Sequence, residues 1–261
     1  MNGLFSGILI VIIGLLIGST LNMIIYRLPI ILNIKKHTHP FSQFNLFFPR
    51  SHCPKCNHTI TWWQNIPILS FLKLRGQCYY CQSPIPKQYL FTECVFPLLM
   101  LGIYLTHQNW TFLAISTWFC MFAYILAAID FKHLILPDVL NYILLWSGLW
   151  INSFNILCPL EHAVYGAIVA YISLWSIYHI FIKLTGKQGF GYGDFKFFAA
   201  IGAWFGITQI YFILMCACLI GILFAVGRMI IKKNRTLSEP LPFGPALACA
   251  SYIFLVGQAI F

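Results

Sequence analysis

The sequence predicts an all-α polytopic membrane protein, with about eight transmembrane helices and one small cytoplasmic domain between the first and the second. Three observations lead to this fold class. Hydrophobic residues make up 60% of the 261 residues and charged residues only 8%, and the mean hydropathy is +0.80. Long apolar runs recur along the chain, and one polar segment interrupts them early. A water-soluble core would not hold this much apolar surface.

The predicted spans are apolar runs of the length that a helix needs to cross a bilayer, roughly 17 to 25 residues. They cover 3–25, 91–107, 110–129, 137–157, 162–184, 194–207, 209–231 and 243–261. The sixth run is the shortest of these. Because the first run has no basic segment before it and no small-residue cleavage site, we expect a retained span rather than a removed signal peptide.

The positions of the sixteen Lys and Arg residues predict the orientation. With the N-terminus outside, all of them fall on or close to one side: in 27–87, at Lys132, in 183–196 and in 228–235. This is the distribution of the positive-inside rule. Topology therefore accounts for the net charge of +10, and we expect membrane lipid, not nucleic acid, as the partner of the basic residues.

The polar segment 27–88 contains two CxxC motifs, Cys53 with Cys56 and Cys78 with Cys81, separated by 21 residues. Two such turns can place four thiolates around one tetrahedral ion. We therefore predict zinc at these four cysteines. A disulfide pair or four incidental thiols are the alternatives, and a cytosolic location argues against disulfides.

Zinc in this site would be structural. A domain of about sixty residues is marginal for a self-supporting core, so a metal would contribute much of its folding free energy. Four thiolates leave zinc no open position for water or substrate, so no hydrolysis is expected there. His52 or His58, which flank the first motif, could replace one cysteine as a ligand. The other six cysteines are expected to pack as small hydrophobic residues.

Two of the six carboxylates are predicted at matching depth in the membrane. Asp130 ends the third span in "AAIDFKHLILPD", and Asp194 begins the sixth in "GYGD". Ionisable residues at the hydrocarbon boundary usually face a partner or a water-filled cavity. Two carboxyls within hydrogen-bonding distance cannot both ionise, and that division of one proton is what aspartyl proteolysis requires. Gly191 and Gly193 would let the backbone approach a substrate closely.

Structural explanations for the same acids remain open. Asp194 could cap the sixth helix, and Asp130 could be a solvated helix end beside Lys132 and His133. Asp138 follows Pro137, so it suits the first turn of the fourth helix, where an acid favours the dipole. A place at the rim of an active site is the alternative for Asp138.

The chain resembles the type IV prepilin peptidases. The resemblance runs nearly end to end and rests on five ordered motifs: "LNMIIYRLP" (21–29), "CPKC…ITWWQNIPILSFLKLRGQCYYC" (53–81), "AAIDFKHLILPDVL" (127–140), "GYGDFK" (191–196) and "LPFGPALA" (241–248). These motifs in order are specific to the family, whereas GxGD alone would not be.

The resemblance implies two activities in a bacterial inner membrane: removal of the leader from type IV prepilins or pseudopilins, and N-methylation of the new amino terminus by S-adenosylmethionine. It implies catalytic roles for Asp130 and Asp194, zinc at the four cysteines, and a link between Gly76 and methyl transfer. The implied domains are the first helix (1–26), a zinc-binding methyltransferase domain (27–88) and a seven-helix protease domain (89–261). The chain departs from the usual family pattern at Pro86 and Leu90, between the second CxxC motif and the second span.

Two rival functions fit parts of the sequence. Paired intramembrane acids also occur in proton-coupled transporters, which would place them near the bilayer midplane and show repeat symmetry. The acids here lie at predicted helix ends, and the sequence has no internal repeat. A presenilin-type intramembrane protease shares GxGD, but it is not expected to carry the cysteine motifs.

Overall fold

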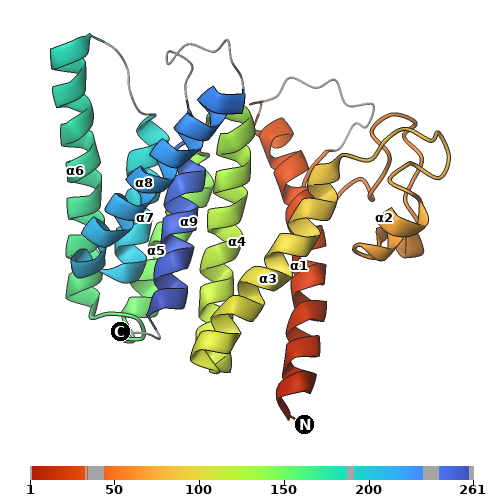
Figure 1. The fold of residues 1–261 in the computed structure, drawn as a ribbon, viewed down its shortest axis with the longest axis horizontal. Helices are drawn as coiled ribbons and strands as arrows, with labels where there is room; N and C mark the ends of the chain where they lie inside the picture. The colour runs from red at the N-terminus through yellow and green to blue at the C-terminus, as the bar shows by residue number, and fades with distance from the viewer. Residues whose placement is uncertain (1, 33, 35–43, 187–190, 232–240, 259–261) are drawn as a thin grey trace. The chain divides into compact units, whose positions relative to one another are not determined.

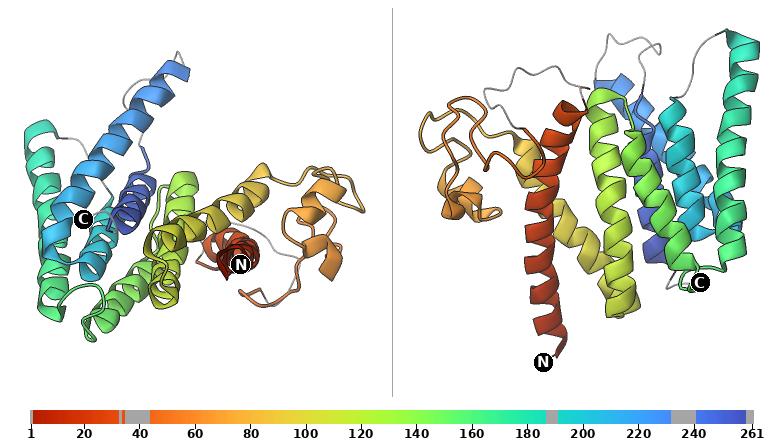
Figure 2. Two further views of the ribbon diagram at one scale, coloured as in Figure 1. Left: turned by 60° about the horizontal axis from the view of Figure 1, so that its bottom comes forward. Right: turned by 180° about the vertical axis from the view of Figure 1, so that it is seen from behind.

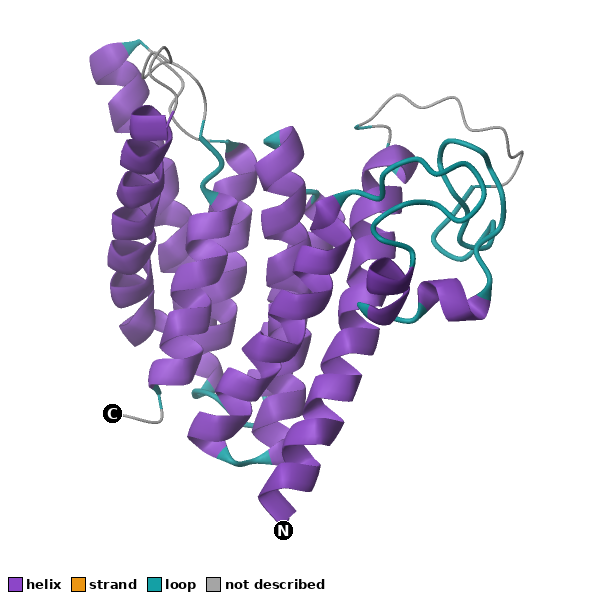
Figure 3. Ribbon diagram, turned by 45° about the vertical axis from the view of Figure 1, so that its right-hand side comes forward, coloured by secondary structure: helices purple, strands orange, loops and turns teal. Residues whose placement is uncertain are grey.

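The structure is a computed structural model that describes residues 2–32, 34, 44–186, 191–231 and 241–258. Over these residues it contains helices and loops but no β-strand (Figure 3), so the all-α class is confirmed. The elements shown in Figure 1 are α1 (Asn2–Ile31), η1 (Trp62–Asn65), α2 (Leu69–Lys73), α3 (Lys87–His107), α4 (Trp110–His133), α5 (Asp138–Asn152), α6 (Leu160–Thr185), α7 (Tyr192–Phe205), α8 (Ile207–Ile231) and α9 (Gly244–Gly257). Parts of the predicted basic segments 183–196 and 228–235, and the end of the last predicted span, lie outside the described residues.

Five of the described helices are long and apolar enough to cross a membrane, where the sequence predicted eight spans. They are α1, α3, α4, α6 and α8. Helices α5, α7 and α9 have 15, 14 and 14 residues. At 1.5 Å per residue, a helix of that length reaches only about 21 Å, less than the roughly 30 Å of the hydrocarbon layer. The predicted run 137–157 is longer than α5 because it includes the loop residues 153–157.

The structure divides into two compact units, Met1–Thr117 and Trp118–Phe261. In the first, α1 packs against α3, and two glycines of α1 lie directly on the α3 backbone. A Cβ on Gly14 would lie 2.6 Å from the Cα of Pro97, and one on Gly18 would lie 3.1 Å from the Cα of Glu93. Small residues let two membrane helices approach this closely. The cysteine-rich segment belongs to the same unit.

Helix α7 is the centre of the second unit and contacts α5, α6, α8 and α9 (Figure 2). Its residues from Asp194 to Phe205 are buried, except for Lys196. Glycine contacts make this packing possible, because a Cβ on Gly202 would overlap the carbonyl oxygen of Gly166 on α6. Trp204 lies against Gly148, and its indole N–H donates to the Leu144 carbonyl at 2.7 Å. The acid at the start of α7 is therefore carried by a helix that neighbours hold on every side.

The contact between α6 and α7 predicts a specific loss of stability. Gly202→Ala adds a methyl group against the Gly166 carbonyl, and such overpacking costs about 1 to 3 kcal/mol. Gly227→Ala on α8 is the matched control, since no described atom lies within 4 Å of a Cβ there. Thermal unfolding in detergent micelles should show a lower midpoint for Gly202→Ala and an unchanged or higher one for Gly227→Ala. Equal midpoints would contradict the tight contact.

Candidate functional site

Asp194 lies in the first turn of α7, where it caps the helix. Its Oδ2 accepts a hydrogen bond from the Gly191 N–H at 3.0 Å, and the Asp194 N–H donates to the Gly191 carbonyl at 3.1 Å. Asp194 therefore does cap α7, the structural alternative to a catalytic role, because this hydrogen bond is the return bond of a capping box. It uses one oxygen. The other, Oδ1, is buried and has no hydrogen-bond partner in the described part of the chain. Since leaving a buried polar atom unpaired is costly, capping alone does not account for this carboxyl.

Asp130 lies in the last turn of α4 and is 5% exposed. Its Oδ2 accepts a hydrogen bond from the backbone N–H of Gly244, the first residue of α9, at 2.9 Å. A Cβ on Gly244 would lie 2.8 Å from the same oxygen. Glycine is therefore the residue that fits here. The motif "LPFGPALA" contains Gly244, but the sequence alone indicates no role for it. The burial of Asp130 excludes the alternative of a solvated helix end.

The structure brings Asp130 and Asp194 within electrostatic range of each other. Two further contacts join the segments that carry them. Leu136 packs on Gly193, where an added Cβ would lie 2.7 Å from the Leu136 Cβ. Lys196 on α7 donates to Asp138 Oδ2 on α5 at 2.7 Å. The two acidic motifs, far apart in the sequence, therefore form one cluster within the second unit.

Asp138 takes part in this cluster as an ion-pair partner. It is the first residue of α5, and its Oδ2 accepts the hydrogen bond from Lys196. Its pair with Lys196 is partly exposed, so it contributes no more than about 1 kcal/mol to stability. The geometry thus fits a place at the rim of the acidic cluster, while the charge still favours the dipole of α5. Lys196 was not singled out from the sequence, because a lone lysine beside an acidic motif carries no distinctive signal.

The two CxxC motifs fold into the same backbone turn. In each, the N–H of the first cysteine donates to the carbonyl five residues later, and the N–H four residues later donates to the carbonyl of that cysteine, at 2.9 to 3.0 Å. The residue four positions after the first cysteine has a positive φ in both turns, 57° at Asn57 and 54° at Gln82. The repeated turn aims two thiols per motif at a common centre.

The four predicted ligands come together as one cluster. The sulfur atoms of Cys53, Cys56, Cys78 and Cys81 all lie within 4.8 Å of one another, and those of Cys53 and Cys81 are 3.8 Å apart. A tetrahedral zinc ion with Zn–S bonds of about 2.3 Å places its sulfurs about 3.8 Å apart. The cluster therefore fits zinc in ligand type, number and spacing.

The surroundings shift the thiol pKa values in opposite directions. Hydrogen bonds from the side chain and backbone of Ser83 lower the pKa of Cys81 to about 6. A backbone hydrogen bond at His58 lowers the pKa of Cys56, but desolvation and the thiols of Cys81 and Cys53 outweigh it and raise that pKa to about 11. Four adjacent thiolates repel one another, so full ionisation of the cluster requires a cation between them.

The histidine alternative is not supported. His52 Nδ1 lies 3.0 Å from the Arg50 carbonyl oxygen, and the His58 ring stacks on Tyr80 with centroids 3.5 Å apart. Within the described residues, neither histidine joins the group of potential metal ligands.

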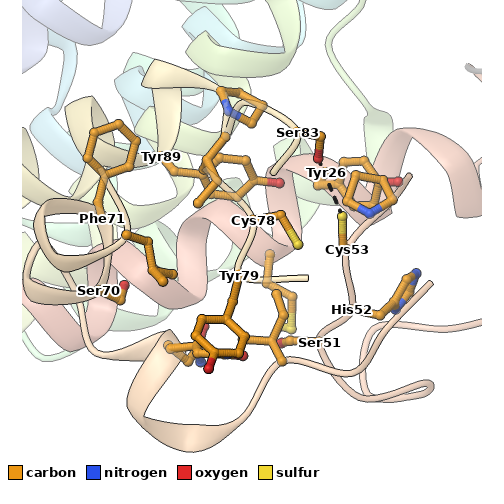
Figure 4. A pocket seen from close by; sticks show the side chains of 18 of the residues that line it. Tyr26, Ser51, His52, Cys53, Ser70, Phe71, Cys78, Tyr79, Ser83 and Tyr89 are labelled. Atoms are coloured by element: carbon orange, nitrogen blue, oxygen red, sulfur yellow. Dashed lines mark hydrogen bonds between the residues drawn. The ribbon is translucent and has the colours of Figure 1, made fainter. Parts of the chain in front are cut away.

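A cavity of about 430 Å³ lies beside the cysteine cluster, between the two CxxC turns, α1, α2 and α3 (Figure 4). Aromatic rings form much of its wall, among them Tyr26, Phe71, Tyr79 and Tyr89. Gly76, for which the family resemblance implies a link to methyl transfer, lies behind this wall. Its φ is +70°, and a Cβ on it would lie 3.0 Å from the Phe71 ring. Gly76 therefore allows Phe71 its position at the cavity.

Comparison with known proteins identifies the family of the chain. The model described as "Bacterial Peptidase A24 N-terminal domain" matches residues 12–107, and that of the "Type IV leader peptidase family" matches 117–226. Proteins named "Prepilin leader peptidase/N-methyltransferase" match almost the whole chain. That of Aeromonas salmonicida (strain A449) is 41% identical over 95% of this chain and 89% of its own length. The chain belongs to the type IV leader peptidase family.

Other relatives in the family show the same extent of similarity. The protein of that name from Pseudomonas aeruginosa is 38% identical over 94% of this chain and 88% of its own length, and that of Dichelobacter nodosus is 35% identical over 99% and 91%. No solved structure matches the chain. The family boundary between 107 and 117 lies next to the division of the structure after Thr117. The two rival functions, a proton-coupled transporter and a presenilin-type protease, are not supported, because the chain belongs to the type IV leader peptidase family.

The cysteine cluster predicts a measurable metal content. The purified chain should hold about one zinc ion, and Cys78→Ser should remove most of it and lower the unfolding temperature, because a structural zinc contributes folding free energy. Cys94→Ser is the control, since Cys94 is exposed and lies outside the cluster. Elemental analysis and thermal melts of both variants would measure this. A folded wild-type protein without zinc would refute the assignment.

Proposed function

We propose that this protein is a membrane aspartyl endopeptidase that removes the basic leader of type IV prepilins or pseudopilins, and that it N-methylates the new amino terminus with S-adenosylmethionine. The relatives that span nearly its whole length are named for both activities. The observation that carries the proteolytic half is the cluster of Asp130 and Asp194. These are two buried acids from different helices, each with one oxygen held by a glycine N–H.

The proposed mechanism divides one proton between the two acids. Because the carboxyls are within electrostatic range, ionising one makes ionising the other harder. The charged member takes a proton from water as the water attacks the scissile carbonyl, and the protonated member polarises the carbonyl oxygen. Asp194 Oδ1, which accepts no hydrogen bond from the described residues, is available for either task. The N–H groups of Gly191 and Gly244 keep both carboxyls oriented.

The substrate supports a site at the membrane boundary. A prepilin presents a short basic leader followed by an apolar helix, so its scissile bond arrives where cytoplasm meets lipid. Asp130 and Asp194 both lie at helix ends, the last turn of α4 and the first turn of α7, which supports that depth. The gathering of Lys and Arg supports an N-terminus outside and 27–88 in the cytoplasm of a bacterial inner membrane. We infer that α5, α7 and α9 also lie within the membrane, as the five long helices do.

The proposed division of labour follows the sequence prediction, with 27–88 as a zinc-binding methyltransferase domain and 89–261 as the protease domain. Zinc would be held by Cys53, Cys56, Cys78 and Cys81. Since sulfur fills all four positions, zinc would cross-link the two CxxC turns and leave no position for water. The metal is thus assigned to folding, and the acids to cleavage.

Removing either acid should abolish cleavage. Asp130→Asn and Asp194→Asn keep the size of the side chain but remove the group that exchanges protons, a change that costs about 10²- to 10⁴-fold in rate. Asp138→Asn, at the rim, should cost much less. The measurement is mass spectrometry of a prepilin leader-plus-helix peptide incubated with each variant in membranes, with insertion checked by immunoblot. Wild-type rates for either Asn variant would exclude the mechanism.

The hydrogen bond from Gly244 predicts a second loss of cleavage. Gly244→Ala would push a Cβ against Asp130 and displace the N–H that holds it. A hydrogen bond to a charged group is worth about 1.5 to 3 kcal/mol, so the expected loss in kcat is roughly tenfold to a hundredfold. Gly257→Ala, at the other end of α9, is the control, because no described atom is close to its added methyl group. Equal rates in the same peptide assay would show that Gly244 does not position Asp130.

A further inference from the structure

The cavity beside the cysteine cluster has the size and walls of a small-molecule site. Its volume of about 430 Å³ lies in the range of pockets that enclose a ligand of nucleoside size. The rings of Tyr26, Phe71, Tyr79 and Tyr89 face it (Figure 4). Aromatic faces bind flat bases by stacking and attract cations such as a sulfonium or an ammonium.

Glu93 gives this cavity its one carboxylate among the described lining residues. It lies on α3 and is 9% exposed. Its Oε2 accepts a hydrogen bond from the Ile68 N–H at 2.8 Å, and the Ser19 side chain also bonds to it. The position of Ser19 follows from the close contact between Gly18 and the Glu93 backbone. The carboxylate is therefore oriented by neutral donors from two other segments.

No Lys or Arg of the described chain forms an ion pair with Glu93. Arg27 also lines the cavity, but its guanidinium donates to the carbonyls of Asn45 and Leu46 at 3.1 and 3.0 Å, and to that of Pro49 at 2.6 Å. Arg27 therefore holds the loop 45–49. A buried carboxylate without a countercharge is costly, so a cationic ligand would relieve the cost.

The backbone at Ile68, the residue that donates to Glu93, is strained. Ile68, which donates to Glu93, has φ of +60° and ψ of −51°. A β-branched residue rarely adopts such a conformation, which costs of order 1 to 3 kcal/mol. Strain of this kind persists where the surroundings enforce it and is common at ligand sites. Here it aims an N–H at the carboxylate that faces the cavity.

We infer that this cavity is the methyl-transfer site, where S-adenosylmethionine lies against the aromatic wall and the Glu93 carboxylate holds the amino terminus of the cleaved substrate. The inference rests on the methyltransferase half of the proposed function and names its site. Gly76 belongs to the same site through Phe71, whose ring it admits to the wall.

Methyl transfer in this cavity conserves atoms and charge. Bound S-adenosylmethionine supplies an electrophilic methyl carbon on a positively charged sulfur. Glu93 accepts one proton from the substrate ammonium and later releases it to water. The freed lone pair of the amine forms the N–C bond as the C–S bond breaks, and the C–S electron pair stays on sulfur as a neutral thioether.

The test measures binding of the amine without any turnover. The full-length protein in detergent is titrated, in the absence of methyl donor, with a peptide carrying the free amino terminus of a cleaved prepilin and with its N-acetylated form. Wild type should bind the free amine about tenfold more tightly or better, because a charge-assisted hydrogen bond is lost on acetylation. Glu93→Gln should lose this preference. Glu161→Gln, which alters a carboxylate of α6 in the other unit, should keep it.

A second measurement locates the donor. Ultraviolet cross-linking of radiolabelled S-adenosylmethionine should label peptides from 19–27 or 71–93. Phe71→Leu should weaken donor binding about threefold to tenfold, whereas the exposed Phe91→Leu should not. Zinc content and melting temperature verify folding of each variant.

The outcomes separate this inference from the proposed function. Leader cleavage and methylation are assayed on the same preparations. If wild type performs both reactions but shows no amine preference, if Glu93→Gln keeps that preference, or if the label lies elsewhere, the cavity assignment is wrong and the function stands. A wild type that cleaves the leader but never methylates the product would overturn the methyltransferase half and the cavity assignment with it.

Discussion

The burial of α7 on all sides is the constraint on which the rest of the second unit depends. This helix of 14 residues contacts α5, α6, α8 and α9, and its residues from Asp194 to Phe205 are buried except for Lys196. Glycines at the contacts let the neighbours approach, and the apolar residues between them fill the interior. The consequence falls on Asp194. It lies in the first turn of this buried helix, so the packing of α7 against its neighbours places the carboxyl.

Backbone N–H groups complete the positioning of the acids. Gly191 holds one oxygen of Asp194, and Gly244 holds one oxygen of Asp130. Backbone donors fixed in helical turns do not rotate away, unlike side-chain donors, so they preserve orientation at small entropic cost. Each also leaves the second carboxyl oxygen outside its own hydrogen bond. This arrangement reconciles a structural role with a catalytic one: Asp194 caps α7 with one atom and retains Oδ1 for chemistry.

In the first unit, the constraint is the small hydrophobic core of the cysteine-rich segment. Its cysteine-rich segment has little core, and short helices such as α2 have five residues. Two identical CxxC turns converge on one centre, where a metal would replace the missing hydrophobic core. The polar network around Glu93 then ties α2 to α3 through the Ile68 N–H. A segment that is cross-linked by a metal and held to α3 can keep a cavity open beside it. This cavity is where we place methyl transfer.

The sequence by itself determined the helical class, the two acidic motifs and the four cysteines. Apolar run length and CxxC spacing are local signals, so they survive without knowledge of the fold. The tertiary structure showed that α5, α7 and α9 are shorter than the five helices long enough to cross a membrane. It also revealed Gly244, 114 residues from Asp130, the Lys196 ion pair and the setting of Glu93. These depend on contacts between distant segments, which no periodicity or spacing in one sequence encodes.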